Sequence, residues 1–544
     1  MNKIKEVLVM LVLAGASLSA KAQFPPVGMS GSGTSSSPWE IATPAHLKAL
    51  ADWVNAGNGE ATMGKYFKLV SDIDLSGYAS GDGWEPIGTY ISGTDSSKAF
   101  QGVFDGNNHR VVNLTIDRDT VSYIGLFGTV WRGIIQDLGV TNCNVTGRYY
   151  VSGLIGIAYI SSTINGCYAT GSVSGGIYVG GLVGRNYISS SITNCYTTGN
   201  VSGGGYVGGL VGRSDSLSMI TNCHSTSDIN ATAGYVGGLV GTAYRATITN
   251  CYATGEVNGQ GPIGGLVGWI SGNLQNSYAT GNVNGVDYTG GLVGASMEAA
   301  ISNCYASGSV KGTGSLIGGI IGRLQENSTM QNCVAANDSV KGGVNYPTSI
   351  NRLMGNYTTG STYSNNYVLR DMVVSSGTTI LNRSDNDLNG TGKSIDTLQS
   401  LEFYNTAGNW YNNTAWDINS PSSVWDICDG EEELPFLRWQ GIDCDGVGIV
   451  GTRHALPLQV YPNPTSGMLQ VTSYEGGKIE IYDVVGQCVF TTPSFGHPSK
   501  GGESSTSAQF PSFGGAGVVI DVSHLASGMY FLKVDNKVVK FVKE

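Results

Sequence analysis

The chain has 544 residues, a formal net charge of −11 and only 13% charged residues. The acidic balance argues against nucleic acid or an anionic membrane surface as a partner, because both select basic patches. The 81 glycines are about twice the usual share, and because they follow no Gly-X-Y register they exclude collagen and favour tight, repeated turns.

Residues 1–22 predict a secretory signal peptide. Two lysines near the start precede an apolar run over 7–18 that is too short to span a bilayer. A small-residue site then predicts cleavage between Ala22 and Gln23. We therefore expect an exported mature chain without a transmembrane segment, which begins with a flexible lead-in over 23–37.

Residues 38–122 predict an N-terminal cap and the first coils of a repeating fold. Within them, residues 44–55 predict an amphipathic helix with Thr43 as its N-cap and Pro44 at its first position. Because the terminal unit of a stacked-repeat protein must cover an open end, this helix is expected to close the fold.

Residues 123–334 form an array in which one phrase recurs. Gly-Gly-Leu-Val-Gly occurs at 180–184, 208–212, 237–241, 264–268 and 290–294, with related copies before and after. The closing glycines fall at 128, 156, 184, 212, 241, 268, 294 and 322. Self-similarity at such a period is typical of stacked supersecondary units. The array predicts an all-β fold, a right-handed parallel β-helix or β-solenoid with about 28 residues per coil.

A second phrase, Ile-Thr-Asn-Cys-Tyr at 192–196, is in phase with the first. Strict alternation would place Ile192 and Cys195 on opposite faces, so a bend at Asn194 that returns both to the interior is expected. The equivalent positions predict a corner ladder, in which glycine at one place also tolerates a positive φ: Asn142, Gly166, Asn194, Asn222, Asn250, Asn276, Asn303 and Asn332.

Seven of the ten cysteines share one repeat position: Cys143, Cys167, Cys195, Cys223, Cys251, Cys304 and Cys333, with Ser277 in the remaining place. An inward ladder of small, apolar free thiols is one interpretation, and disulfides between adjacent coils are the alternative. Cys428 and Cys444 are a separate disulfide candidate. No Cys-x-x-Cys pair occurs, which argues against metal binding by the ladder.

Residues 335–445 predict the last coils and a C-terminal cap. This segment holds a short helix over 394–404 with Ser394 as N-cap, and a group of tryptophans expected to cluster: Trp410, Trp416, Trp425 and Trp439. Residues 446–455 predict a linker. Residues 456–544 predict about seven short strands and hence a small Ig-like β-sandwich, interrupted by a disordered loop over 491–516.

The array resembles the GLUG repeat, which is common in exported, adhesin-like proteins of Bacteroidetes. The phrases at 39–43, 72–77, 84–88 and 100–106 are similar to the lead-in of such arrays. The resemblance implies a β-helix-like rod and surface display, and it does not imply one activity.

The C-terminal module resembles the sorting domain of the type IX secretion system. The blocks at 461–467, 479–486, 521–530 and 540–544 match that domain in order, and the first holds the sorting motif: Tyr461, Pro462, Asn463, Pro464 and Gly467. The resemblance implies the type IX secretion machinery as a partner. It also implies a protein that is secreted, at the outer-membrane surface or extracellular.

No catalytic constellation and no cofactor motif is found in the sequence. The six histidines never form a metal-ligand pair, and His-Glu-x-x-His and Gly-x-Ser-x-Gly are both absent. Charges such as Arg185, Arg213 and Asp215 look sparse and scattered. One segment imitates a calcium loop, with an Asx-rich turn as the alternative interpretation: Asp385, Asp387, Asn389 and Asp396.

Aromatic residues at one repeat position are the best binding candidates: Tyr168, Tyr196, His224, Tyr252, Tyr278 and Tyr305. Outward aromatics suit sugar faces or partner surfaces, although stacking along the rod could serve stability alone. A second row of tyrosines at one repeat position, which we call the second file, allows the same two interpretations, binding or stability: Tyr150, Tyr178, Tyr206, Tyr235 and Tyr288.

The sequence thus predicts an exported cell-surface β-solenoid that binds a glycan or a host or cell-surface protein without catalysis. The alternative is a carbohydrate-active β-helix enzyme, a polysaccharide lyase or glycoside hydrolase, which needs clustered carboxylates or a basic residue in a groove.

Overall fold

The computed structural model describes residues 24–26, 28–428 and 433–442, and the strands with a few adjoining residues between 459 and 543. The predicted signal peptide, its cleavage site and most of the predicted loop over 491–516 lie outside these residues. The chain divides into two compact units, Met1–Gln440 and Gly441–Glu544. No helix among the described residues is both long and apolar enough to cross a membrane.

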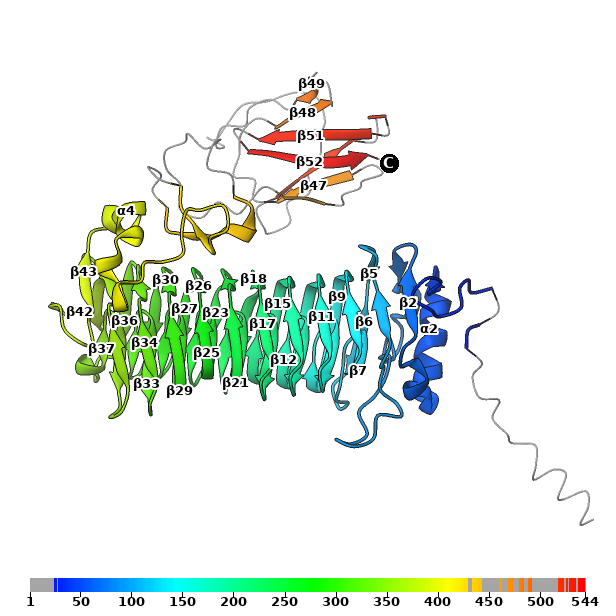
Figure 1. The fold of residues 1–544 in the computed structure, drawn as a ribbon, viewed down its shortest axis with the longest axis horizontal. Coiled ribbons are helices and arrows are strands. Elements are labelled where there is room, and N and C mark those ends of the chain that lie inside the picture. Colours follow the sequence, from blue (N-terminus) through cyan, green and yellow to red (C-terminus); the bar gives the residue numbers. More distant parts are fainter. Residues whose placement is uncertain are drawn as a thin grey trace, which may run out of the picture. The chain divides into compact units, whose positions relative to one another are not determined.

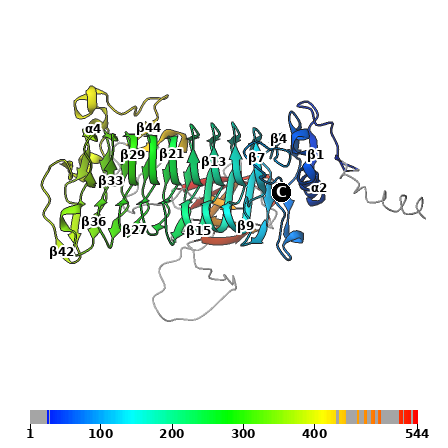
Figure 2. The same ribbon diagram turned by 90° about the horizontal axis from the view of Figure 1, so that it is seen from below.

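The first unit is a β-solenoid of about 13 turns with roughly 28 residues per coil, as the repeat predicted. One regular coil consists of β12 (Tyr168–Gly180), β13 (Val183–Tyr187) and β14 (Ser191–Thr193). These strands pair in parallel with β15 (Tyr196–Gly208), β16 (Val211–Asp215) and β17 (Met219–Thr221) of the next coil. Figures 1 and 2 show the strands of successive coils side by side along the rod.

An N-terminal cap covers the first coil. The helix α2 (Pro44–Trp53) begins after Thr43, whose hydroxyl accepts a 3.2 Å hydrogen bond from the His46 N–H, and its apolar side chains are buried. Strands β1 (Trp39–Ile41) and β2 (Tyr66–Leu69) pair beside it. Part of the segment predicted as a flexible lead-in packs here, since the Phe24 ring stacks 4.8 Å from the Trp53 ring.

The expected bend is present at the corner of each coil. Asn194 has a φ of 55°, and Ile192 and Cys195 on either side of it are both buried. All eight predicted corner residues, Gly166 included, have positive φ. Their amides also bond along the rod: Asn222 Nδ2 donates to Asn194 Oδ1 at 3.3 Å, and Asn250 Nδ2 donates to Asn222 Oδ1 at 3.3 Å. Asparagine serves this position because its short polar side chain tolerates the left-handed region.

The seven cysteines of the array are free thiols and all are buried, so the inward ladder is confirmed. Burial raises the pKa of five of them, to about 12 for Cys143 and well above the ordinary value of 9.0 for Cys167, Cys195, Cys223 and Cys304. Ser277 takes the remaining place, and its hydroxyl donates to the Gln275 carbonyl at 2.8 Å.

The C-terminal cap closes the other end of the rod. The single helix predicted over 394–404 is two short helices, α3 (Ile395–Leu398) and α4 (Leu401–Asn405), because Ser400 caps the second as Ser394 caps the first. The side chains of Trp410, Trp416 and Trp425 cluster and are buried, but Trp439 is 37% exposed and lies outside that cluster.

Beyond α4 the cap continues with β44 (Trp425–Asp426), which pairs antiparallel with β45 (Phe436–Leu437). Cys428, two residues after β44, is bound in a disulfide. Its expected partner Cys444 lies outside the described residues.

The second unit contains the seven predicted strands in two antiparallel sheets. One sheet holds β46 (Gln459–Tyr461), β47 (Met468–Thr472) and β50 (Gly517–Asp521). The other holds β48 (Ile479–Asp483), β49 (Cys488–Thr491), β51 (Gly528–Val534) and β52 (Lys537–Lys543). Of the predicted sorting motif, Tyr461 ends β46, and Pro462, Asn463, Pro464 and Gly467 lie outside the described residues.

Candidate functional site

The candidate binding residues at the first repeat position form one continuous stack, which we call the capped ladder: Tyr168, Tyr196, His224, Tyr252, Tyr278 and Tyr305. Neighbouring ring centroids are 4.7–5.0 Å apart and the rings are within 6° of parallel. The parallel register of the coils sets this spacing, because equivalent residues of adjacent strands lie about 4.8 Å apart.

The C-terminal cap contacts four of the six rungs, which corrects the expectation that all six outward rings are exposed. Tyr278 and Tyr305 are only 5% and 3% exposed, and the Trp425 ring lies 6.1 and 6.0 Å from theirs. The Tyr278 hydroxyl donates to Gln440 Oε1 at 3.1 Å.

The same cap segment extends over the middle of the ladder. The Trp439 ring lies 5.9 Å from His224 and 5.7 Å from Tyr252, and its Nε1–H donates to the Asn250 carbonyl at 3.1 Å. Burial lowers the pKa of His224 from 6.5 to about 4, so this imidazole is neutral near neutral pH. Tyr168 and Tyr196 are the two rungs outside these tryptophan contacts.

Parallel stacking has a further consequence for recognition. Sugars and partner groups contact the faces of aromatic rings, but each inner ring of the capped ladder has both faces covered by its neighbours. The ladder therefore presents ring edges, and the contacts of four of its rungs with tryptophans of the C-terminal cap favour a role in holding the coils and that cap together.

The second file stacks in a similar way over Tyr150, Tyr178 and Tyr206, whereas the Tyr235 ring is tilted by 50° from that of Tyr206. This file lies outside the contacts of the C-terminal cap. Tyr123, Tyr150, Tyr178 and Tyr206 have centroid separations of 4.7–4.9 Å, and Tyr90 extends the stack at one end. These rings are half-buried. Their backbones have φ between 53° and 65°, a region in which a bulky residue is an outlier. Backbone strain of this kind is often retained at functional sites.

A third file runs beside it and was not recognised in the sequence. Strand register places Trp131, Tyr159 and Tyr187 in line, and the next coil puts Asp215 in that place before Tyr244 resumes the aromatic series. Trp131 and Tyr159 are 7% exposed, while Tyr187 is half-buried.

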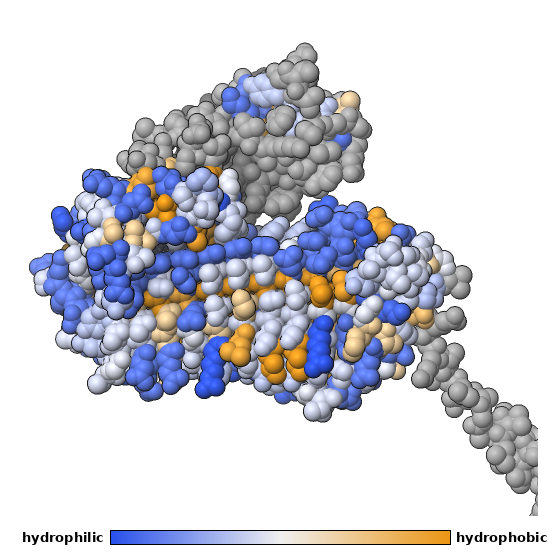
Figure 3. Space-filling view, in the orientation of Figure 1, coloured by the Kyte–Doolittle hydropathy of each residue, from blue (hydrophilic) through white to orange (hydrophobic). Residues whose placement is uncertain are grey.

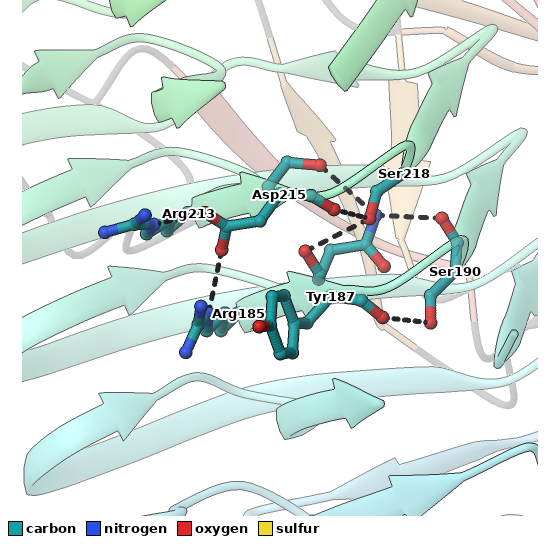
Figure 4. Close-up of polar contacts among 8 residues, drawn as sticks. Arg185, Tyr187, Ser190, Arg213, Asp215 and Ser218 are labelled. Atoms are coloured by element: carbon teal, nitrogen blue, oxygen red, sulfur yellow. Dashed lines mark hydrogen bonds and ion pairs between the residues drawn. The ribbon is translucent and has the colours of Figure 1, made fainter. Parts of the chain in front are cut away.

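Two arginines connect the second and third files. Arg185 of β13 and Arg213 of β16 are register partners, and their Nε–H groups donate to the two oxygens of Asp215 at 2.8 and 2.6 Å. The Asp215 side chain is 2% exposed, whereas those of Arg185 and Arg213 are 19% and 23% exposed. Figure 4 shows both guanidinium groups on the same side of Asp215, with that of Arg185 next to the Tyr187 ring.

The guanidinium groups also pack on aromatic rings. That of Arg185 lies 3.9 Å from the Tyr187 centroid and 6.0 Å from Tyr178, and that of Arg213 lies 5.9 Å from Tyr178 and 5.6 Å from Tyr206. Burial opposes the charge on Arg185, but the Asp215 carboxylate outweighs burial and raises the pKa of the guanidinium.

A serine hydroxyl stabilises the turn that follows β13 and the equivalent turn that follows β16. The Ser190 hydroxyl donates to the Tyr187 carbonyl at 2.7 Å, and the Ser218 hydroxyl donates to the Asp215 carbonyl in the equivalent turn (Figure 4). Arg185, Arg213 and Asp215 looked scattered in the sequence. The signal that connects them is the period, since Arg213 stands 28 residues after Arg185 and Asp215 two residues later.

We call this surface the aromatic face and define it by its two arginines and five half-buried rings: Tyr123, Tyr150, Tyr178, Tyr187, Tyr206, Arg185 and Arg213. On the side seen in Figure 3, most of the solenoid surface is hydrophilic or of intermediate hydropathy, and apolar residues lie in short groups.

Two of the calcium-loop residues, Asp385 and Asn389, bond Arg352. Asp385 accepts a 2.7 Å hydrogen bond from Arg352 Nη2, and Asn389 accepts one from the Arg352 N–H at 3.1 Å. Asp396 lies in the first turn of α3. Among the described residues no group of three or more His, Cys, Asp or Glu could hold a metal ion.

Two family models match segments of the chain. The GLUG motif matches residues 175–202, 203–230, 232–258 and 285–311. The secretion system C-terminal sorting domain matches residues 459–544. A domain of this kind indicates export by the type IX machinery to the cell surface or the extracellular space.

Two curated relatives match parts of the chain. A protein described as a Gly-rich membrane protein of Evansella cellulosilytica is 36% identical over 119 residues, which are 21% of this chain and 12% of that protein. Halomucin of Haloquadratum walsbyi is 35% identical over 149 residues, 26% of this chain and 2% of halomucin. The chain thus spans a small part of the curated relatives it matches.

Two solved structures are similar at low identity. A crystal structure described as an immunoglobulin A1 protease from Bacteroides ovatus has a TM-score of 0.31 and 18% identity, over 75% of this chain and 94% of that one. A structure named IgA1 protease has a TM-score of 0.37 and 21% identity, over 49% of this chain and 22% of that one.

Proposed function

For a β-solenoid that carries GLUG motifs and ends in a secretion-system sorting domain, we propose an adhesin-like role in which the aromatic face binds a glycan or protein outside the cell. The observation that carries this proposal is the arrangement of Arg185 and Arg213, held by one buried carboxylate beside strained, half-buried tyrosines.

The charged group of the aromatic face supports ligand binding more than stability. A buried carboxylate with two arginines contributes little net stability, because removing three charges from water offsets their attraction. Neighbouring coils lack this charged group, because the register position of Arg185 holds Ile157 one coil before and Thr242 two coils after. The capped ladder, in contrast, already has its contacts within the protein.

The carbohydrate-active enzyme is the second candidate, and the same group of residues is the observation that favours it. Two arginines beside a carboxylate are part of what a polysaccharide lyase needs. However, Asp215 is buried and bonded to both arginines, so a proton on a bound sugar is out of its reach unless the group rearranges. We therefore favour binding.

The test compares two single variants of the full exported chain on arrays of glycans and of surface proteins. Tyr178→Asn removes a ring from the aromatic face and substitutes a residue that tolerates the Tyr178 φ of 63°. Tyr196→Ala removes a ring from the capped ladder at a rung outside the tryptophan contacts. We expect binding to fall in the first variant and to persist in the second.

Loss of binding in Tyr196→Ala alone would return the function to the capped ladder and contradict the proposal. A wild-type chain that retains no ligand on either array would also contradict it. Release of new reducing ends from a bound polysaccharide would favour the enzyme over the adhesin.

A further inference from the structure

We propose that the ligand of the aromatic face is an acidic polysaccharide, whose carboxylate or sulfate groups bind Arg185 and Arg213. This inference rests on the proposed function and specifies the chemical class of the ligand. Because two guanidinium groups share one carboxylate, Arg185, Arg213 and Asp215 together carry a local positive charge on a chain whose net charge is −11.

The arginines are positioned to receive an anion. Each uses its Nε–H to bond Asp215, so the terminal nitrogens of both groups are not taken by that carboxylate. The ion pairs that these two arginines form with described residues both go to Asp215. Planar guanidinium groups pair with carboxylate and sulfate oxygens through parallel hydrogen bonds. Fixing them in advance lowers the entropy lost on binding.

Asp215 holds the two arginines in place. It occupies a file position held by Tyr187 one coil before and by Tyr244 one coil after. An aromatic ring there would continue the stack but would leave two neighbouring arginines unpaired and repelling each other. The exchange of a ring for a carboxylate is therefore explained by the arginines.

The surroundings favour a polymer of sugars over a compact anion. The rings of Tyr123, Tyr150, Tyr178 and Tyr206 cover one another's faces, so the file presents edges and hydroxyl groups once per coil. A row of phenolic hydroxyls that donate and accept hydrogen bonds matches the hydroxyl groups of a polysaccharide. A ligand that repeats along its length can use a surface that repeats along the rod.

The experiment measures binding of the full exported chain to matched polymers. Polygalacturonate and dextran sulfate supply carboxylate and sulfate. Carboxyl-reduced polygalacturonate and dextran are their neutral counterparts, and poly-glutamate is an acidic chain without sugars. We expect binding to one or both acidic polysaccharides, weakening as salt is added because the contact is ionic, and little binding to the neutral forms.

The protein variants locate the site. We expect Arg185→Gln/Arg213→Gln to weaken binding of the acidic polysaccharide about tenfold or more, as expected when charge-assisted hydrogen bonds are lost. Arg323→Gln is a matched control, because Arg323 occupies the same register position three coils beyond Thr242 and lies 6.0 Å from the Tyr288 ring. That control should bind like wild type.

The outcomes separate this inference from the proposed function. Equal binding of acidic and neutral polysaccharides, with loss in Tyr178→Asn, would keep the aromatic face as a binding site and overturn the acidic ligand. Binding of poly-glutamate but of no polysaccharide would assign an acidic protein partner and also overturn it. Equal weakening by Arg323→Gln would show that the charge effect is not located at Arg185 and Arg213.

Discussion

Gly184 lies directly over the backbone of Tyr150 in the preceding coil: a Cβ atom on the glycine would stand 2.7 Å from the tyrosine carbonyl carbon and 2.6 Å from the Gly156 oxygen. The closing glycines of five further phrases meet a tyrosine carbonyl carbon in the same way, at 2.4–2.8 Å: Gly156, Gly212, Gly241, Gly268 and Gly322. Five of these six tyrosines, all except Tyr235, have a positive φ. The repeated glycine phrase and the tyrosine file are therefore two parts of one packing arrangement.

Gly184→Ala should destabilise the solenoid. The glycine is not in the left-handed region, so the cost comes from space: the new methyl group would meet backbone atoms that cannot move without shifting a coil. We expect a loss of about 1–3 kcal/mol, as for overpacked interiors, measured by thermal or denaturant unfolding.

Gly205→Ala is the control for that substitution. Gly205 lies in β15 of the same array, has no positive φ, and a Cβ there would meet no atom within 4 Å. The melting temperature of the Gly205→Ala variant should stay near that of wild type. Equal destabilisation of both variants would contradict the close-approach explanation.

The asparagine corner predicts an order of stability at Asn222. Wild type should be most stable, Asn222→Gly intermediate and Asn222→Ala least stable. Both variants lose the amide hydrogen bonds with Asn194 and Asn250, but alanine also pays about 1–2 kcal/mol for the left-handed conformation. Urea unfolding of the three proteins measures the order, and an alanine variant at least as stable as the glycine variant would refute it.

His224 predicts a loss of stability in acid. Its pKa is about 4 in the folded chain against 6.5 for an ordinary histidine, so the unfolded chain binds the proton more readily between these values. The buried, neutral imidazole contributes about 1–3 kcal/mol to the free energy of unfolding. This contribution is present above about pH 6.5 and is lost as pH falls through about 4.

His224→Tyr tests this assignment, since tyrosine occupies the neighbouring rungs at Tyr196 and Tyr252. The variant should keep more of its stability than wild type when unfolding is compared from about pH 7 to about pH 4. An NMR titration that places the pKa of His224 near 6.5 would contradict the buried environment.

The thiol ladder predicts low cysteine reactivity in the native chain. All seven thiols are buried. Burial raises the pKa of Cys167, Cys195 and Cys223 above 9.0, and the thiolate is the reactive form. Iodoacetamide should label the seven ladder cysteines slowly in the folded protein and fast in denaturant, as counted by mass spectrometry.

The raised thiol pKa values also make the stability of the folded chain depend on pH. Because the folded pKa exceeds the unfolded value, the stabilisation is fully present below about pH 9 and is lost as pH rises beyond it. Cys195→Ser should reduce this alkaline loss and still fold, since Ser277 occupies the same place in another coil. Rapid labelling of the native chain would contradict the buried ladder.

The sequence alone was sufficient for the features that repeat. The phase of Gly-Gly-Leu-Val-Gly predicted the coil, and the conflict between Ile192 and Cys195 predicted the positive φ at Asn194. Local caps such as Thr43 and Ser394 were equally visible, because capping involves residues three positions apart. These features depend on chain geometry within one coil, and period and spacing record that geometry directly.

The tertiary structure decided which repeated residues are available to a ligand. Trp439 and Gln440 lie on His224, Tyr252 and Tyr278 although they are more than 160 residues away in the chain, and no period relates a cap to the coils that it covers. Arg185, Arg213 and Asp215 become one group only when adjacent coils stack in register. Periodicity determines which residues align along the rod, whereas burial and ion pairing depend on contacts between segments that follow no repeat.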